Sequence, residues 1–167
     1  GQGSHEKRRY TDQPNNGPFS TDNQQRTKQA YFACISYIDA QIGKVLDSLE
    51  KNGLADNTVV ILWSDHGYHL GEKGMWGKTT NYELDTRVAL ICRVPSMKAA
   101  GKKSQALVEL VDVYPSLASL AGLSVPKHCE GSSVGPLLNA PDKEWKPAAF
   151  SQFSRGSRMG YAMRTDR

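Results

Sequence analysis

An acid, an imidazole and a lysine stand close together in the segment "ILWSDHGYHLGEKGMWGK", which runs from Ile61 to Lys78. Asp65 and His66 directly follow a short apolar run. A carboxylate and a neutral imidazole can share a divalent cation, or lie beside an anionic group near one. Lys78 adds a point charge of the kind that binds a sulfate or phosphate oxygen. Together, these side chains suit Lewis-acid chemistry on a sulfuryl or phosphoryl centre.

Each of these residues also has a plain structural interpretation. Asp65 can cap the turn that follows it, and His66 can pack as a hydrogen-bonded core histidine. A lone lysine such as Lys78 is usually a solvated surface group. The loop between them favours the functional interpretation, because glycines let a backbone turn tightly and approach a ligand closely. The glycines of this loop are Gly71, Gly74 and Gly77.

The elements that must position these residues begin with a long helix and a strand. Apolar residues recur at spacings of three and four between Asn23 and Lys51, which predicts an amphipathic helix. Ser20 or Thr21 can cap its start, and Gly53 is placed to end it. The run over 57–64 is continuously apolar and β-branched, as is typical of a strand covered on both faces. Helix, short loop and buried strand form half of a βαβ unit and predict an α/β fold with a mainly parallel sheet.

Later segments add more elements. A second strand is predicted over 87–94, closed by Pro95. The segment 107–123 predicts a helix in which Pro115 marks a break or the first turn of a new helix. Two short strands are predicted near the end of the chain, over 148–154 and 159–165.

The position of the acid and the imidazole fits this architecture. Ligands of open parallel sheets bind beyond the carboxyl ends of the strands, and Asp65 and His66 stand at such an end. Two buried strands alone cannot form a sheet with both faces covered and both edges protected. We therefore expect the chain to be a piece of a larger α/β domain.

Composition narrows the classes of partner. The 167 residues carry a net charge of +4, from 21 basic and 17 acidic residues, and the basic ones are scattered. This predicts a solvated surface and no nucleic-acid partner. No apolar stretch approaches the ~20 residues of a membrane helix, so no membrane partner is expected. Residues 1–22 are polar and predict a loop or linker inside a longer chain.

The three cysteines lack the spacing of a metal site. Cys34 lies in the helical pattern and Cys92 in the second strand pattern, so both are expected to be buried core thiols. Cys129 lies in a predicted loop and can be free or paired.

The segment "WSDHGYHLGEKGMWGKTTNYELDTRVALI" resembles the second signature region of the sulfatases, within the alkaline-phosphatase superfamily. It is similar to the iduronate-2-sulfatase branch, which carries Asp-His where arylsulfatases often carry Asp-Asn. Three further blocks resemble that family in the same order: "QAYFACISYIDAQIGKVLDSLEKNGLADNTVV", "ALVELVDVYPSLASLAGLSVP" and "MGYAMRTDR".

This resemblance implies a fold and a division of the chain. The fold would be part of an alkaline-phosphatase-like, mainly parallel sheet flanked by helices, with short antiparallel strands at the C-terminus. Residues 23–148 would form the C-terminal part of the sulfatase catalytic domain. Residues 149–167 would begin the C-terminal antiparallel subdomain.

The resemblance also implies roles for the residues of the first motif. Asp65 would ligate a divalent cation, usually calcium, and His66 would lie at that metal or at the sulfate ester oxygen. His66, or a histidine outside this chain, would protonate the leaving alcohol. Lys78 falls on the lysine that binds the sulfate and would neutralise its charge during the reaction.

Other residues of the same loop receive weaker assignments. Tyr68, His69 and Trp76 would contact the alcohol part of the substrate. Arg87 is interpreted as structural, since it starts a strand and has two acids nearby with which to pair. These acids are Glu83 and Asp85.

The nucleophile that the family uses is not in this sequence. Sulfatases depend on a formylglycine made from a cysteine or serine in a Cys-x-Pro-Ser-Arg type motif, and none of the three cysteines fits that motif. At Cys92, "CRVPS" has its proline one place too late and its arginine too early. The chain would therefore be a sulfatase fragment that needs the N-terminal portion of the domain as its partner.

Three functions stay open at this point. The first is hydrolysis of sulfate esters, with a sulfated small molecule or carbohydrate as substrate and a secreted, periplasmic or lysosomal location. The second is hydrolysis of phosphonate or phosphate esters by the same superfamily. The third is a non-enzymatic domain in which the residues at the strand end are structural.

Overall fold

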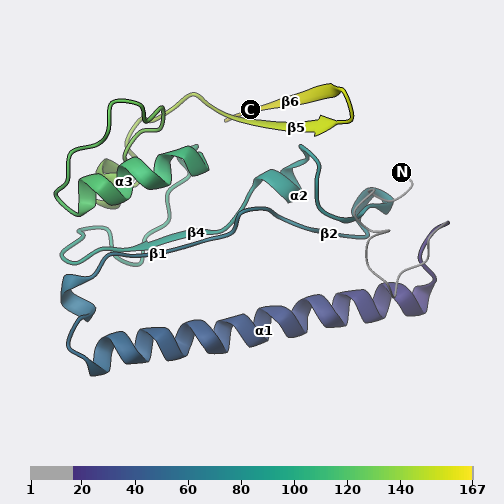
Figure 1. The fold of residues 1–167 in the computed structure, drawn as a ribbon, viewed down its shortest axis with the longest axis horizontal. Helices are drawn as coiled ribbons and strands as arrows, with labels where there is room; N and C mark the ends of the chain where they lie inside the picture. Colours follow the sequence, from purple (N-terminus) through teal and green to yellow (C-terminus); the bar gives the residue numbers. More distant parts are fainter. Residues whose placement is uncertain (1–16, 167) are drawn as a thin grey trace. The chain divides into compact units, whose positions relative to one another are not determined.

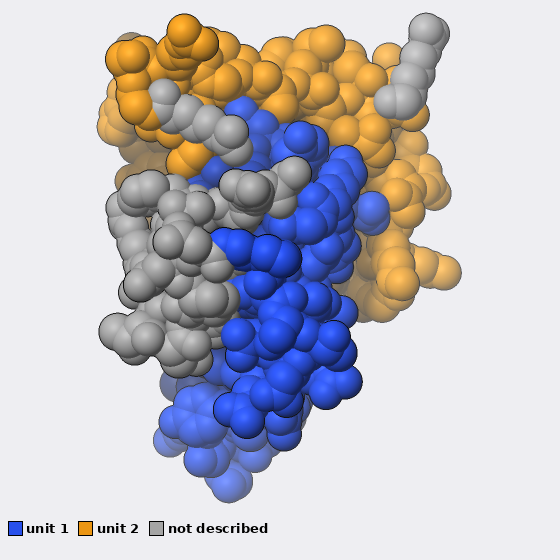
Figure 2. Space-filling model, turned by 90° about the vertical axis from the view of Figure 1, so that its right-hand side faces the viewer, with its two compact units in different colours: residues 1–55, 66–88 blue, residues 56–65, 89–167 orange. Residues whose placement is uncertain are grey.

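A computed structural model describes residues 17–166, so most of the loop or linker predicted over 1–22 lies outside the described residues. The chain divides into two compact units, which Figure 2 colours blue and orange. The first unit consists of Gly1–Ala55 and His66–Val88, and the second of Asp56–Asp65 and Ala89–Arg167. The domain boundaries predicted after residues 22 and 148 stay predictions.

The first unit is built on the long helix α1, Thr21–Lys51, as predicted (Figure 1). Ser20 is its N-cap, and its side chain accepts a hydrogen bond of 3.2 Å from the Asn23 N–H. Gly53 has a φ of +65° and lies just beyond the C-cap Asn52, where a glycine satisfies the left-handed backbone at little cost.

The apolar stripe of α1 is only partly covered, contrary to the packing that its spacing suggests. No residue of the helix is buried, and Ile35, Ile38 and Val45 are 46%, 53% and 67% exposed. Cys34 is exposed as well, so the prediction of a buried thiol there is wrong for the described residues. A helical period predicts which side chains share a face, but it does not say what covers that face.

The rest of the first unit is a short hairpin and a single helical turn. The strand β2, His69–Leu70, pairs antiparallel with β3, Trp76–Gly77, and the helix α2 spans Glu83–Thr86. The ring of Trp76 packs against Phe19, with centroids 4.9 Å apart, and both side chains are buried. This aromatic pair anchors the hairpin to the segment that precedes α1.

The second unit holds the two predicted strands as an antiparallel pair. The strand β1, Val60–Trp63, pairs with β4, Leu90–Arg93, and Trp63 faces Leu90. The strand pairings of residues 17–166 are all antiparallel, so the mainly parallel sheet is not seen among them. This pairing fits the connection between the strands, because parallel neighbours usually have a crossover helix between them. Here the only α-helix between β1 and β4 is the four-residue α2.

Burial within this pair also differs from the prediction. A strand covered on both faces was expected over 57–64, but Leu62 and Trp63 are 39% and 47% exposed. On β4, Ile91 is 60% exposed. Among the described residues, these apolar side chains are therefore only partly covered.

The helix α3, Val113–Leu120, begins directly after a 3-10 turn over Leu110–Asp112 (η4). Pro115 lies in the first turn of α3, which confirms one of the two expected places for it. The predicted C-terminal strands form one hairpin, in which β5, Ala148–Arg155, pairs with β6, Arg158–Thr165. The remaining 3-10 turns are Ala55–Asn57 (η2), Glu72–Gly74 (η3) and Gly135–Leu138 (η5).

Two further findings concern the helices and the thiols. Across residues 17–166, no helix combines the length and the apolar character needed to cross a membrane. Cys92 is partly buried, and this burial raises the pKa of its thiol. Cys129 forms no disulfide with another cysteine of the described residues.

Candidate active site

Lys78 directly follows β3, at a point where the backbone is strained. Its neighbour Thr79 has a φ of +78°, a left-handed conformation that is unusual for a β-branched residue. The Thr79 hydroxyl donates a hydrogen bond to the Lys78 carbonyl. Gly77, on the other side, has a φ of +87°, which glycine adopts without a steric penalty. The direction of the chain at Lys78 is therefore set by an unusual pair of backbone conformations.

The turn of the hairpin needs a glycine and an acid. Gly71 has a φ of +110°, and a Cβ there would lie 2.9 Å from the Trp76 ring. Glu72 Oε2 accepts a hydrogen bond of 2.6 Å from the Leu70 N–H. Partial burial would raise the pKa of Glu72, but the backbone N–H groups of Leu70 and Glu72 outweigh it and lower the pKa. The predicted tight loop is confirmed, and its carboxylate stabilises the turn.

The turn after the strand end depends on the absence of a side chain at Gly67. Its N–H donates a hydrogen bond of 2.8 Å to the Asp85 carbonyl, and a Cβ would lie 1.8 Å from the Leu84 carbonyl oxygen. His66 Nδ1 lies 2.9 Å from the Gly67 carbonyl oxygen. A carbonyl only accepts, so Nδ1 carries the proton in this contact and Nε2 is the basic nitrogen of a neutral ring.

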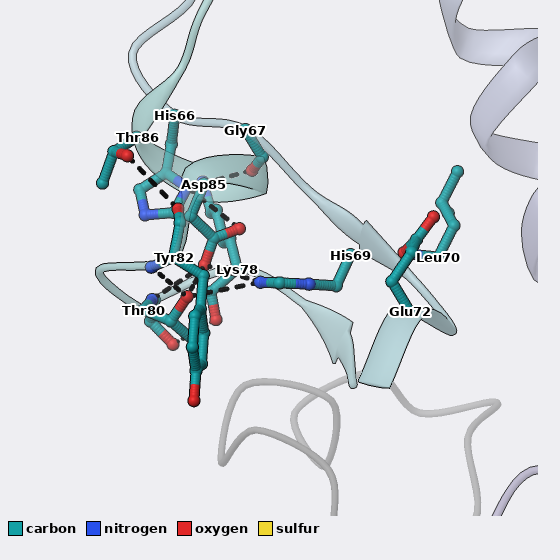
Figure 3. A network of polar contacts seen from close by, with 11 residues as sticks. His66, Gly67, His69, Leu70, Glu72, Lys78, Thr80, Tyr82, Asp85 and Thr86 are labelled. Atoms are coloured by element: carbon teal, nitrogen blue, oxygen red, sulfur yellow. Dashed lines mark hydrogen bonds and ion pairs between the residues drawn. The ribbon is translucent and has the colours of Figure 1, made fainter. Parts of the chain in front are cut away.

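A buried polar network lies beside these two turns (Figure 3). His69 and Asp85 are each 1% exposed and Thr80 is 5% exposed. Asp85 Oδ2 accepts hydrogen bonds from the Thr80 N–H and hydroxyl, at 2.8 and 2.5 Å, and lies 3.3 Å from His69 Nε2. The second oxygen, Oδ1, lies 3.8 Å from His66 Nδ1. One carboxylate thus lies next to both histidines of the motif.

Two of the predicted substrate contacts pack against other aromatic rings. Tyr68 lies against Tyr31 of α1, with ring centroids 5.3 Å apart. Trp76 is 5% exposed and has the Lys28 ammonium 5.9 Å from its ring centroid, in addition to its contact with Phe19. The predicted contacts of Tyr68, His69 and Trp76 with a substrate stay predictions. The burial of His69 and Trp76 argues against such a contact for these two residues.

Asp65 belongs to the second unit and is exposed. Within residues 17–166, no group of three or more His, Cys, Asp or Glu side chains is arranged to hold a metal ion. Calcium in proteins takes about 6–8 oxygen ligands. Asp65 and His66 are therefore at most a part of a calcium site, and their assignment as metal ligands stays a prediction.

No spacing in the sequence singles out Thr80 and Asp85 as a pair. The sequence suggests Asp85 only as a partner for Arg87, but its carboxylate faces Thr80 and His69 instead. The only signal in the sequence was an acid a few residues after a histidine-containing loop. Many acids stand in such places, so this signal could not have distinguished the network.

Three chemically useful groups of the first unit therefore stand on segments that are linked by polar contacts. His66 offers a basic Nε2, Lys78 offers an ammonium group, and the buried Asp85 holds the segments on which both stand. In the hydrolysis of an anionic ester, a cation can stabilise the negative charge of the transition state and an imidazole can transfer a proton.

Several known proteins are similar to this chain. The family model described as "Sulfatase" matches residues 2–123. Iduronate 2-sulfatase of Mus musculus is 37% identical over 169 residues, covering 80% of this chain and 31% of that protein. A solved structure described as a complex with the substrate D-glucosamine-2-N,6-O-disulfate has a TM-score of 0.80 and 33% identity, covering 86% of this chain and 31% of that one.

A solved structure whose description names a different activity is also similar. The phosphonate monoester hydrolase of Silicibacter pomeroyi has a TM-score of 0.75 and 29% identity, covering 80% of this chain and 26% of that one. The chain spans about a third or less of the length of these relatives. The likeness confirms the predicted α/β fold class of the alkaline-phosphatase type.

Proposed function

Because this chain belongs to the sulfatase family, we propose that the protein carrying it hydrolyses sulfate esters. The match of the family model over residues 2–123 is the observation that carries this proposal. We propose a sulfated carbohydrate as the substrate class. This is supported by the likeness to iduronate 2-sulfatase and to a structure that binds a glucosamine disulfate.

In the proposed reaction, this chain supplies groups that bind the sulfate and move a proton. Lys78 donates hydrogen bonds to a sulfate oxygen and stabilises the negative charge of the transition state. As an imidazolium, with a second proton on Nε2, His66 delivers that Nε2 proton to the leaving alcohol oxygen and returns to the neutral ring. Asp65 would contribute one carboxylate ligand to a divalent cation, and such a cation, when bound, would draw charge from the sulfate oxygens.

The attacking group comes from outside this chain. By the family resemblance it is a formylglycine, and none of the three cysteines stands in the required motif. The proposed partner is the N-terminal portion of the catalytic domain. The exposed apolar side chains of α1 support this partner, because exposed apolar surface often marks where another protein binds. We also propose a secreted, periplasmic or lysosomal location, which cell fractionation would test.

The test is an assay of the intact protein with a chromogenic aryl sulfate. Lys78→Ala should lower kcat/KM by about 10²–10³, as the loss of one charge-stabilising contact does in other hydrolases. The matched control is Lys103→Ala, which removes an exposed lysine of the second unit and should leave kcat/KM unchanged. Equal activity of Lys78→Ala and the parent protein would refute the sulfate-binding assignment.

The second candidate is hydrolysis of phosphonate monoesters, which the likeness to the Silicibacter pomeroyi enzyme favours. The same protein should be assayed with an aryl phosphonate at matched concentration. A higher kcat/KM for the phosphonate than for the sulfate would replace the first proposal with this one.

A further inference from the structure

Asp85 is a fully buried acid for which the proposed reaction has no direct use. It stands on α2, and its Oδ2 faces three donors: the Thr80 N–H, the Thr80 hydroxyl and His69 Nε2. Buried carboxylates are costly unless several donors satisfy them. Its other oxygen, Oδ1, is buried without a hydrogen-bond partner among the described residues, and such an oxygen next to two histidines of the site calls for an explanation.

The donors around Asp85 fix the protonation pattern of His69. The single hydroxyl proton of Thr80 goes to the carboxylate, so the Thr80 oxygen can only accept from His69 Nε2, which lies 3.3 Å away. Both neighbours of Nε2 are therefore acceptors, and Nε2 carries the proton. Nδ1 of His69 is then a bare acceptor, buried and without a hydrogen-bond partner among the described residues.

The same residue is tied to the turn that carries His66. The Asp85 carbonyl accepts the Gly67 N–H at 2.8 Å, and Asp85 Oδ1 lies 3.8 Å from His66 Nδ1. Asp85 Oδ1 is buried and has no hydrogen-bond partner among residues 17–166. It is therefore placed as a second possible acceptor for the N–H of His66 Nδ1, which contacts the Gly67 carbonyl oxygen in this structure.

Asp85 also reaches the segment of Lys78. Both of its hydrogen bonds to Thr80 hold the residue that directly follows the strained Thr79, two positions after Lys78. A left-handed threonine is strained and persists only where its surroundings hold it. The carboxylate of Asp85 helps to keep Thr79 in this conformation, because it binds the next residue, Thr80.

From these contacts we infer that Asp85 is a positioning residue for sulfate-ester hydrolysis: its buried carboxylate aligns Lys78, through Thr80, and the imidazole of His66. This rests on the proposed function. Asp85 touches no substrate itself. It acts by fixing the positions of the Lys78 ammonium group and of His66 Nε2, so that both can contact the same anion.

The experiment compares Asp85→Asn with Glu50→Gln in the intact protein, since Glu50 is an exposed acid of the same unit. Asparagine can still accept from Thr80 but no longer offers His66 a second acceptor. Loss of a supporting contact of this kind typically lowers activity by about 10–100-fold. We expect such a loss of kcat/KM per folded molecule in Asp85→Asn, together with weaker inhibition by inorganic sulfate, and no change in Glu50→Gln.

A double-mutant cycle separates positioning from mere folding. If Asp85 acts through Lys78, then Asp85→Asn should cost much less in the Lys78→Ala background than in the parent protein. If Asp85→Asn does not fold, Thr80→Val removes one of the two Thr80 contacts and serves in the same cycle. Nitrogen-15 NMR of the histidine rings should show one tautomer of His69 in the parent protein and a mixture in Asp85→Asn.

The outcomes are distinguishable from failure of the proposed function. If Lys78→Ala leaves sulfate hydrolysis intact, the proposed site itself is wrong. If Lys78→Ala is impaired while Asp85→Asn loses only thermal stability, with kcat/KM and sulfate inhibition unchanged, Asp85 is a structural acid and the inference is overturned. Additive effects in the cycle would overturn it as well.

Discussion

Lys146 Nζ lies 2.7 and 2.9 Å from the two carboxylate oxygens of Asp112, a residue with no exposed surface. The same ammonium lies 2.8 Å from Glu109, whose other oxygen accepts the Phe150 N–H at 3.0 Å. Asp112 also receives the backbone N–H of Ser132 at 2.7 Å. One lysine therefore neutralises two acids and joins the chain before β5 to the start of α3.

Replacing this lysine should destabilise the second unit strongly. Lys146→Met leaves the buried Asp112 charged and without its cation, and removing one partner of a buried pair costs about 3 kcal/mol. Urea unfolding of the intact protein would measure this loss. Lys143→Met is the matched control, because Lys143 is an exposed lysine of the same loop and should change stability by less than ~0.5 kcal/mol. Equal effects of the two substitutions would contradict the assignment.

The same pair predicts a dependence of stability on alkaline pH. Burial alone would lower the pKa of Lys146, but its hydrogen bonds to Asp112 and Glu109 and their charges outweigh this and raise the pKa. A raised pKa in the folded state stabilises the protein fully below the unfolded pKa of about 10.4, and this contribution is lost as the pH rises through the folded value. The difference in unfolding free energy between the parent protein and Lys146→Met should be constant from about pH 7 to pH 9 and should shrink above about pH 10.4. A difference that grew with pH would exclude this explanation.

A methyl group at Gly67 should be tolerated poorly. An alanine Cβ there would lie 1.8 Å from the Leu84 carbonyl oxygen, so the backbone of α2 would have to move. Overpacking of this kind costs about 1–3 kcal/mol or more. Gly43→Ala in the middle of α1 is the control, because nothing lies within 4 Å of its added Cβ and helical alanine should gain about 0.5–1 kcal/mol. Thermal unfolding of the two variants should therefore shift in opposite directions.

The strain at Thr79 predicts a conflict between stability and activity. Thr79→Gly removes the penalty of its left-handed backbone and should raise the unfolding free energy by about 1 kcal/mol. It should also lower kcat/KM for the aryl sulfate, because the segment that carries Lys78 becomes more mobile. Thr86→Gly, in the right-handed helix α2, should instead lose stability. If Thr79→Gly were less stable than the parent protein, the conformation would be held without strain.

Local patterns in the sequence predicted the elements whose signals lie within a few residues. The helix over Thr21–Lys51 carries its own cap and terminating glycine, and the hairpin of β5 and β6 is two strands joined by a tight turn. The pairing of β1 with β4 is different, because it depends on the path of the chain between them. Their apolar composition was compatible with parallel or antiparallel neighbours, and only the structure shows the latter.

The candidate site shows the same division between local and distant signals. The chemistry of His66 and Lys78 could be predicted, because both residues stand in one short segment of the sequence. The contacts of Asp85 could not be predicted, since its carboxylate meets Thr80 and His69 only when the hairpin is folded. Burial also could not be derived from residue type, as His69 is 1% exposed although histidine in a glycine-rich loop suggests a solvent-facing group.

The contact of Gly67 with Leu84 bears on how variant libraries of this protein should be scored. A growth or activity screen would rank position 67 among the essential residues, alongside those that bind the substrate, although it has no side chain to offer. Its intolerance arises from a carbonyl oxygen of the neighbouring helix, 1.8 Å from where a Cβ would stand. Pairing the screen with a readout of protein abundance would separate the two groups, because Gly67 variants would disappear from the cell while Lys78 variants would accumulate and remain inactive.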